Sequence, residues 1–497
     1  MIFLYSVSKF FNYVKKDTVL DWLNMYGGSC GFNKIKSEFQ QNLFKEGQQI
    51  EDKVVDLLKT RFQDEWTDLT RYKFQNFTHY DKTISAIKNK KPVIYQGLLC
   101  LSNGVYGIPD IILRKDVFKR WFNQEVKDED KSNYIIVDIK KSLKVNKNND
   151  VSKSSSNYEW IQFQLSVYEE SLKYHFDRSF EKPVVLSLKE DDIYYGFMEF
   201  EKQDTDACVN YYKELENDGC NWIPYPKPTN KYMYPNMKNI YDQEWRHIKK
   251  DFAHKIKELT LLPYVSVDKR DCLWNRDVYS INDKNCYEQL QTVKNIPPHV
   301  LEIVRANQNE GSEYNADMIR KELESLTKDK VLLFVDLETI HSGKVFLSCV
   351  KFNNKYTYFS SYNKEEIDSD VVVLQTKEYI QQLYKDYPNL CVVYYAGSEE
   401  KILDIKDGID LYEVIKRNKY AKYGLYTYGL KDIYNNCFRV KEETNISNGL
   451  DACVLCEKIL NGNLDAKKIE KTKIDLLNYV RKDVMILDKL ITKFLRY

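Results

Sequence analysis

The chain has 497 residues, of which 43% are hydrophobic, and this is enough for at least two hydrophobic cores. Its 75 Lys and Arg residues balance 74 Asp and Glu residues, so the net charge of +1 gives no whole-chain electrostatic argument for nucleic-acid binding. Any basic surface must be local. No apolar run is long enough for a membrane span, and Lys9 interrupts the apolar start before a signal sequence forms.

Cysteine usage bears on the compartment. The 11 Cys residues show no paired framework spacing, and an odd number cannot be fully paired within one chain. We therefore expect a soluble, intracellular protein without membrane association, in the cytoplasm or, as an alternative, in the nucleus.

The N-terminal part shows the pattern of an α/β domain. Hydrophobic periodicity predicts a helix at 41–62, a hairpin at 94–114, a strand at 134–139, a helix at 158–174 and strands at 183–199. A proline-rich stretch at 224–235 follows and reads as a linker. We place the first domain at 1–235.

Residues 236–328 form a predicted, mostly helical connecting module without a catalytic cluster. In the third region, 329–497, the pattern predicts strands at 331–339, 344–352 and 355–362, a helix at 376–387, a strand at 390–397 and further helices. Asn353 and Asn354 fit a turn between the second and third strands. Three adjacent strands, a helix and a fourth strand are typical of an RNase H-like sheet.

A first set of candidate residues lies in the N-terminal domain. Asp138 and Lys140 stand two apart on the apolar strand YIIVDIKKS and so share one face of it. A carboxylate-x-basic triplet is expected roughly 11 times by chance in such a chain, so the strand context decides. A charged pair on a central strand costs several kcal/mol unless it is paired or binds metal. Asp110 and Glu51 are further candidate ligands.

These segments resemble the RecB-like nucleases of the PD-(D/E)xK class. The resemblance rests on GQQIEDKVVDLL, VIYQGLLC, GIPDIILR, VDIKKS and QLSVYEESL, which occur in this order. It implies that Glu51, Asp110 and Asp138 bind Mg²⁺ or Mn²⁺ and that Lys140 is catalytic. It also implies that Gln164 and Tyr168, four apart on one helix face, support the site.

A second set lies in the C-terminal region. Asp336 and Glu338 project together from the strand VLLFVDLET, Glu399 and Glu400 begin the helix SEEKIL, and Tyr479 and Asp483 share a helix face. Several carboxylates around two metal ions suit phosphodiester hydrolysis, with a tyrosine hydroxyl orienting water.

This half is similar to the DnaQ-like 3′-5′ exonucleases, through DLET and Tyr479-x-x-x-Asp483. The resemblance implies metal ligands at Asp336, Glu338, Glu400 and Asp483, with Tyr479 catalytic, and it implies structural roles for Asp410 and Lys431. In the second motif the chain has Tyr395-Ala396 and then Glu400, where relatives have His-Asn and then Asp.

Two cysteines form a lone Cys-x-x-Cys, Cys453 and Cys456, on a predicted helix. We expect buried thiols there, and the six histidines show no spacing typical of a zinc site. An iron-sulfur cluster, present in some relatives of the first domain, is not expected, because a tight Cys-x-x-Cys element is missing from that domain.

The combination resembles predicted bacterial, archaeal and large-DNA-virus nucleases in which a RecB-like domain is fused to a YprB-like exonuclease domain. It implies a metal-dependent nuclease acting on nucleic acid, with DNA the expected substrate and an exonuclease the expected class. The alternative is a nucleic-acid-binding scaffold of a repair or replication complex with one or both nuclease sites inactive. Lys141, Lys144 and Lys147 could contact phosphates, or form a solvated loop. No Walker A sequence occurs, so unwinding requires a helicase or other replication and repair partner.

Overall fold

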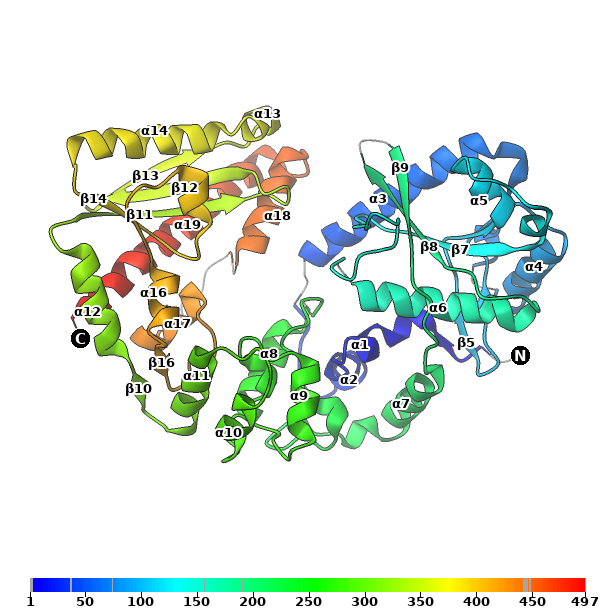
Figure 1. The fold of residues 1–497 in the computed structure, drawn as a ribbon, viewed down its shortest axis with the longest axis horizontal. Helices are drawn as coiled ribbons and strands as arrows, with labels where there is room; N and C mark the ends of the chain where they lie inside the picture. Colours follow the sequence, from blue (N-terminus) through cyan, green and yellow to red (C-terminus); the bar gives the residue numbers. More distant parts are fainter. Residues whose placement is uncertain are drawn as a thin grey trace. The chain divides into compact units, whose positions relative to one another are not determined.

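The computed structural model describes residues 3–35, 38–73, 75–155, 157–189, 192–242, 244–440, 446 and 448–496. The chain divides into two compact units, Met1–Phe252 and Ala253–Tyr497. Both units mix helices with β-sheet, as the sequence predicted at the level of fold class (Figure 1).

Unit 1 is built on a six-stranded mixed sheet. Its order is β2-β3-β6-β7-β8-β9. The bounds of these strands are β2 Trp66–Asp68, β3 Val93–Tyr95, β6 Ile111–Arg114, β7 Tyr134–Ile139, β8 Val184–Lys189 and β9 Asp192–Phe197. A smaller sheet joins β1 (Tyr5–Ser6), β5 (Val105–Gly107) and β4 (Leu99–Cys100). The predicted hairpin is therefore the antiparallel pair β3 and β6, and the predicted strand 134–139 is confirmed.

Helices cover both faces of this sheet. Alternate residues of β7 divide between two cores: Val137 packs with Val54 and Leu58 of α3, and Ile136 packs with Leu165 of α6. This is the period-two alternation of a strand that is buried on both sides. The helices of the unit are α1 Phe11–Val14, α2 Val19–Tyr26, α3 Glu38–Arg61, α4 Asn76–Lys88, α5 Lys115–Trp121, α6 Tyr158–His175 and α7 Thr205–Asp218.

The proline-rich stretch and the residues after it pack on the start of the chain. Lys249, on α8 (Arg246–Ile256), is fully buried and forms ion pairs with Asp17 at 2.8 Å and with Asp242. Asn236 donates its backbone N–H to Asp17 at 2.9 Å. The contacts of 236–252 with unit 1 explain why the division between units falls after Phe252, whereas the sequence analysis put a boundary at 235.

Unit 2 contains a five-stranded sheet with the order β13-β12-β11-β14-β15. The strands are β11 Val331–Thr339, β12 Val345–Phe352, β13 Lys355–Ser360, β14 Leu390–Tyr394 and β15 Gly408–Asp410. The first three are antiparallel neighbours, and β14 runs parallel to β11. Asn353 and Asn354 have φ of 46° and 63°, the left-handed conformation that the predicted turn between β12 and β13 requires.

The helices α14 (Val371–Asp386) and α19 (Ala466–Leu495) lie on opposite faces of this sheet (Figure 1). Leu333 and Val335 of β11 pack with Val372 and Ile380 of α14, so the residues between them face α19. The shorter helices α13 (Lys364–Asp368), α15 (Ser398–Leu403), α16 (Leu411–Arg417), α17 (Leu430–Phe438) and α18 (Gly449–Leu460) complete the sheet's surroundings.

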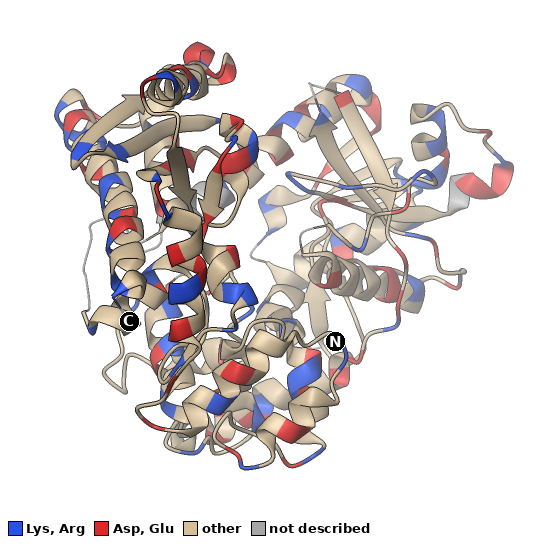
Figure 2. Cartoon of the chain, turned by 60° about the vertical axis from the view of Figure 1, so that its left-hand side comes forward, with Lys and Arg blue, Asp and Glu red and all other residues tan. Residues whose placement is uncertain are grey.

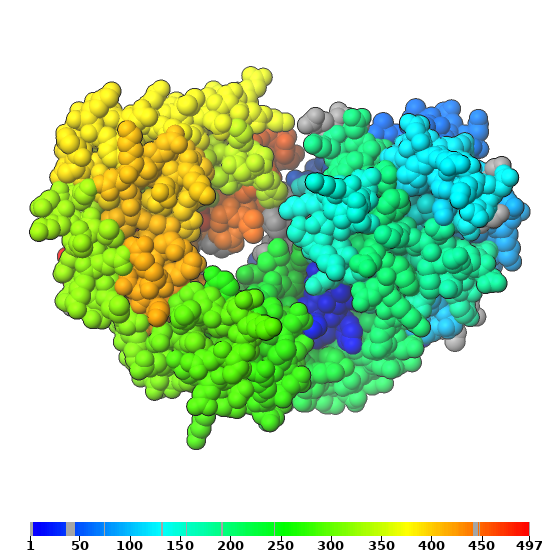
Figure 3. Space-filling view, in the orientation of Figure 1, coloured from blue at the N-terminus to red at the C-terminus, as the bar shows by residue number. Residues whose placement is uncertain are grey.

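The segment before β11 is mostly helical, as predicted. It comprises α9 (Val267–Trp274), α10 (Cys286–Gln291), α11 (Pro298–Gln308) and α12 (Ala316–Thr327), with β10 (Glu313–Tyr314) pairing with β16 (Ala421–Lys422). Within unit 2, Figure 3 shows the green residues of this segment against the orange residues around α16. This segment therefore packs as part of unit 2.

Charged residues of both signs are interspersed on the helices in the view of Figure 2, in keeping with the near-zero net charge. Among the described residues, no helix is long and apolar enough to cross a membrane.

Candidate active sites

The carboxylates of the first candidate site lie at the ends of two paired strands. Asp110 directly precedes β6, and Asp138 stands near the end of β7, with Ile111 opposite Val137 in the antiparallel register. The backbone N–H of Ile139 donates a 2.7 Å hydrogen bond to Asp110. This bond fixes the Asp110 side chain beside the residue that follows Asp138.

Glu51 reaches the same place from α3. Its carboxylate accepts hydrogen bonds from the hydroxyl of Tyr95 at 3.2 Å and from the side-chain amide of Gln96 at 3.3 Å. The same amide lies 3.5 Å from Asp110. Gln96 therefore bridges two of the predicted metal ligands.

Lys140 is the cation of this group. Its Nζ lies 2.5 Å from a carboxylate oxygen of Asp138, whose side chain is only 4% exposed. Burial lowers the pKa of Lys140, but the charges of Asp138, Asp110 and Glu51 outweigh it, and the net pKa is raised. Lys140 consequently remains protonated at neutral pH.

For Asp110 and Glu51, the effect of burial on the pKa outweighs the effects that lower it, and the pKa of each is raised. Burial raises the pKa of Asp110 well above its usual value, and Asp138 and Glu51 add to this while Lys140 opposes it. Burial also raises the pKa of Glu51, against the hydrogen bond from Tyr95. A divalent cation would relieve this repulsion between carboxylates.

Gln164 and Tyr168 form the remaining part. The amide of Gln164 donates a 2.9 Å hydrogen bond to the hydroxyl of Tyr168. Burial raises the pKa of Tyr168, and Asp138 and Asp110 raise it further, so the phenol stays protonated. The structure thus brings together all six residues that the sequence predicted here: Glu51, Asp110, Asp138, Lys140, Gln164 and Tyr168.

The second candidate site is a tighter acidic cluster. Ligand oxygens of Asp336, Glu338 and Asp483 all lie within 4.8 Å of one another. The first two alternate along β11 on the face toward α19, and Asp483 projects from α19. Glu338 and Asp483 are buried, at 8% and 6% exposure.

The negative charge of the cluster is only partly compensated. Oδ2 of Asp336 is buried and accepts no hydrogen bond from a described residue. Burial raises the pKa of Asp336 well above its usual value, with Glu338 and Asp483 adding to it. Burial also raises the pKa of Glu338 to about 8, and Asp483 contributes. Such a site holds protons or a cation at neutral pH.

A tyrosine and a lysine border the cluster. Burial raises the pKa of Tyr479, and Asp483, to which its hydroxyl is hydrogen bonded, adds to this. Lys431 of α17 places its Nζ 3.2 Å from Asp483 and 3.9 Å from the centre of the Tyr479 ring. Lys431, expected to be structural, therefore contacts two predicted site residues.

The two acids that begin α15 are placed differently. Glu399 is 4% exposed, and its charge raises the pKa of both Asp336 and Glu338. Glu400, the predicted ligand, is exposed and hydrogen bonded to the hydroxyl of Tyr394. The structure thus turns Glu399, rather than Glu400, toward the cluster. Asp410 accepts backbone N–H groups of Ala396, Tyr412 and Glu413, which is a structural role.

Sequence reasoning missed four of the residues at these sites. Tyr95 is the last residue of β3 and Gln96 follows it, within the segment VIYQGLLC, and this position at the end of an apolar strand was the available signal. Glu399 stands beside Glu400 in the sequence and Lys431 lies in the segment YGLKDIYNNCF, but no local pattern assigns either residue to the site. Nothing in the sequence alone distinguishes Glu399 from its neighbour.

A hard divalent cation such as Mg²⁺ or Mn²⁺ prefers oxygen ligands. Such an ion suits carboxylate oxygens that are buried or half-buried, lie close together and have few hydrogen-bond donors. In the second cluster, the buried Oδ2 of Asp336 accepts no hydrogen bond from a described residue, and such an ion would satisfy it. The arrangement can therefore hold a metal, keep a tyrosine hydroxyl as a hydrogen-bond donor and supply a cation from Lys431 or, in unit 1, from Lys140.

Comparison with known proteins adds little to these observations. No family model matches the chain, and no curated protein matches it. A match was found to the crystal structure of a protein called SSO0001, with 13% sequence identity, over 40% of this chain and 83% of that one. The TM-score of 0.16 is too low for an argument about fold or function.

Proposed function

We propose that the protein is a metal-dependent nuclease that hydrolyses phosphodiester bonds in nucleic acid, with DNA as the expected substrate. The observation that carries the proposal is the cluster of Asp336, Glu338 and Asp483, whose ligand oxygens lie within 4.8 Å of one another. Three buried or half-buried carboxylates this close cost several kcal/mol unless protons or a cation neutralise them.

The first site supports the same chemistry in unit 1. Three carboxylates, a protonated lysine, a glutamine and a tyrosine converge from α3, the β3–β6 hairpin, β7 and α6. In this proposal Glu51, Asp110 and Asp138 hold the metal and Lys140 places a positive charge next to them. Gln164 and Tyr168 keep the position of the acids, because the Tyr168 phenol is buried beside Asp138 and Asp110.

The sheet orders are consistent with the two family resemblances. In unit 2, three antiparallel strands followed by a parallel β14 agree with the RNase H-like order expected for a DnaQ-like exonuclease domain. In unit 1, helices on both faces of a mixed sheet with Asp138 and Lys140 at the end of a central strand agree with the PD-(D/E)xK expectation. We propose both assignments on this basis.

The bound Mg²⁺ or Mn²⁺ would polarise the phosphate and activate water. The residues of the chain prepare the site for this. In unit 2, Asp336, Glu338 and Asp483 would ligate the ion, and Glu399 adds negative charge beside them. The hydroxyl of Tyr479, protonated at neutral pH, donates a hydrogen bond toward Asp483 and orients it.

The loop after β7 offers a local basic surface. Lys144 and Lys147 are exposed, whereas Lys141 forms an ion pair with Glu46 of α3. Exposed lysines in the loop that follows Lys140 are suited to contacts with the phosphates of a bound strand. They would position the substrate without reading its sequence.

The test is cleavage of end-labelled single- and double-stranded DNA and RNA with Mg²⁺ or Mn²⁺. Lys140→Ala and Asp336→Ala each inactivate one proposed site, and Lys141→Ala and Glu400→Gln are matched controls at neighbouring positions. Loss of products in one variant would assign the chemistry to that unit. Metal-independent binding without cleavage by the wild type would overturn the proposal in favour of a nucleic-acid-binding scaffold.

A further inference from the structure

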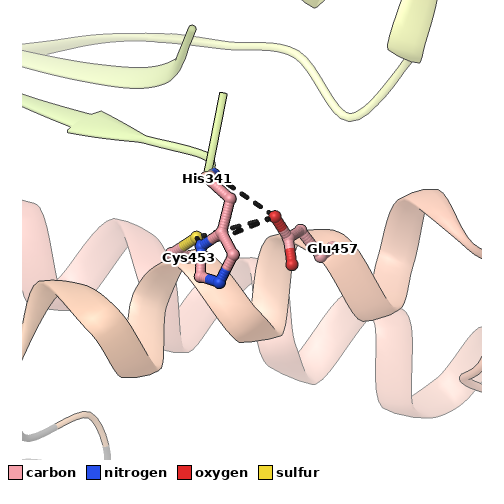
Figure 4. A group of neighbouring side chains, drawn as sticks. All are labelled: His341, Cys453 and Glu457. Atoms are coloured by element: carbon pink, nitrogen blue, oxygen red, sulfur yellow. Dashed lines mark hydrogen bonds and ion pairs between the residues drawn. The ribbon is translucent and has the colours of Figure 1, made fainter. Parts of the chain in front are cut away.

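A third cluster of potential metal ligands lies in unit 2, apart from the carboxylates of the candidate active site. Nδ1 of His341 lies 2.8 Å from Sγ of Cys453 and 3.8 Å from a carboxylate oxygen of Glu457 (Figure 4). The Cys453 Sγ is 3.8 Å from the same oxygen. All three donor atoms therefore face a common point.

Two elements supply these residues. His341 follows the end of β11, in a tight turn where Ile340 donates its N–H to the carbonyl of Lys344 at 2.9 Å. Cys453 and Glu457 are four residues apart on α18 and so lie on one face of it. Glu457 also accepts the backbone N–H of His341 at 3.2 Å, which fixes both the turn and the carboxylate.

The geometry differs from that of a catalytic relay. In a cysteine nucleophile with a histidine base, the cysteine and the orienting carboxylate contact opposite nitrogens of the imidazole. Here Cys453 and Glu457 both approach Nδ1. Donors that converge on one point are arranged for a cation rather than for proton transfer along a chain.

We propose that His341, Cys453 and Glu457 bind a zinc-class transition-metal ion. With metal–ligand bonds of about 2.0–2.3 Å and tetrahedral angles, the donor atoms of such a site stand about 3.3–3.6 Å apart. To reach this range, the 2.8 Å separation must lengthen by about 0.5–0.8 Å and each 3.8 Å separation must shorten by about 0.2–0.5 Å. A thiolate and an imidazole select zinc-like ions over Mg²⁺.

Partial exposure leaves room for a fourth ligand. The side chains of His341 and Glu457 are 31% and 18% exposed, so water can complete the coordination. Cys456, the other thiol of the Cys-x-x-Cys, is fully buried and is not among the three residues whose donor atoms converge. It therefore offers a matched control for Cys453.

The ion would join the end of β11 to α18. Glu338 lies on β11, three residues before His341. Its Oε2 stands only 3.5 Å from where a Cβ on Gly449, the first residue of α18, would be. The two metal sites are thus close in the chain but use different donors. The test must separate them, and it does not depend on nuclease activity.

The experiment replaces bound metal with Co²⁺ in the full-length protein and records the absorption spectrum. We expect one Co²⁺ with a thiolate-to-metal charge-transfer band, displaced by one equivalent of Zn²⁺. The band should disappear in Cys453→Ser. In His341→Gln, where the native side chain is 31% exposed, the apparent affinity for Co²⁺ should fall at least tenfold. The band should persist in Cys456→Ser and in Asp336→Asn.

Two results would overturn the site. One is Co²⁺ binding without a thiolate band, with binding lost in Asp336→Asn, which would place the ion in the acidic cluster. The other is a thiolate band that survives in His341→Gln and disappears in Cys456→Ser. Near-ultraviolet circular dichroism of each variant shows whether a loss of binding reflects unfolding instead, and Glu457→Gln then supplies the independent second variant.

Discussion

The ring of Tyr168 lies directly against Gly107, where a Cβ would stand 2.2 Å from Cε1 of the tyrosine. No side chain larger than hydrogen fits there without moving the ring. Gly107 stands three residues before Asp110 in the segment GIPD, so one small residue lets the helix α6 deliver Tyr168 next to the predicted metal ligands.

Gly107→Ala should therefore impair the first site selectively. Displacing the Tyr168 ring costs about 1–3 kcal/mol and moves its hydroxyl away from Asp138. We expect cleavage by an Asp336→Asn variant, in which only the first site would act, to fall at least tenfold when Gly107→Ala is added. Equal activity with and without the alanine would show that the position of Tyr168 does not matter.

Glu399 and Glu400 provide a matched pair of neighbouring acids. Glu399 is buried beside the carboxylate cluster, whereas Glu400 is exposed and bonded to Tyr394. We expect Glu399→Gln to reduce Mg²⁺-dependent activity of a Lys140→Ala background roughly 10–100-fold, as loss of a metal-supporting carboxylate does. Glu400→Gln should change it little. The reverse order would restore Glu400 as the ligand.

Lys431 compensates part of the charge of the second cluster in the absence of metal. Its Nζ lies 3.2 Å from Asp483, which is 9% exposed at its side chain. Lys431→Met should lower the free energy of unfolding of the metal-free protein by about 1–3 kcal/mol, because Asp483 loses its partner. Denaturant titrations with saturating Mg²⁺ should show a smaller loss. An identical loss in both conditions would indicate packing alone.

The raised pKa of Glu338 predicts a pH dependence of metal binding. Burial raises this pKa from 4.5 to about 8 in the folded protein. A raised folded-state pKa contributes stability that is fully present below pH 4.5 and is lost as pH rises toward about 8. Mg²⁺ needs the deprotonated acid, so its stabilising effect should grow across the same interval.

Thermal unfolding with and without Mg²⁺ at a series of pH values measures this effect. The difference in Tm should increase with pH in the wild type and become flatter in Glu338→Gln. A Mg²⁺ effect that is constant across the interval would exclude proton release from Glu338.

Lys249 should be a determinant of the stability of unit 1. It is fully buried between Asp17 and Asp242 and also donates to the backbone carbonyl of Asn236 at 2.8 Å. Removing one partner of a buried ion pair costs about 3–5 kcal/mol, because the remaining charges stay buried. We expect Lys249→Ala to lose this amount in chemical unfolding, and Lys250→Ala, at the exposed neighbouring position, to lose little.

The elements that the sequence predicted best are those whose local pattern and tertiary environment agree. The strand at 134–139 and the helix at 158–174 appear as β7 and α6 within one residue, because a fully apolar strand and a helical apolar period leave few alternatives. Residues 371–373 are three β-branched valines, yet they begin α14 because Val372 and Val373 pack on the sheet. Tertiary packing overrides propensity there.

Candidate site residues could be grouped from the sequence where they share one strand or one helix. Spacing on a single strand or helix placed Asp336 with Glu338 and Gln164 with Tyr168. The choice between Glu399 and Glu400 depends on the phase of α15, which is set by Gly397 in the left-handed region at φ 80°. The pairing of His341 with Cys453 spans 112 positions and no local pattern encodes it.

Ligands of both kinds lie at the end of β11. Asp336 and Glu338 belong to the strand, whose pairing with β12 is irregular between Glu338 and Thr339, and His341 follows the strand. If both proposed sites bind metal, they differ in the hardness of the ion that they select. The abundant hard cation binds to the oxygen ligands, and the scarcer borderline ion binds to sulfur and nitrogen. A chelator would then remove both ions, and the effect of losing one could not be separated from the effect of losing the other. Activity measured after Mg²⁺ is added back to a zinc-free protein would instead report the acidic cluster of unit 2 alone.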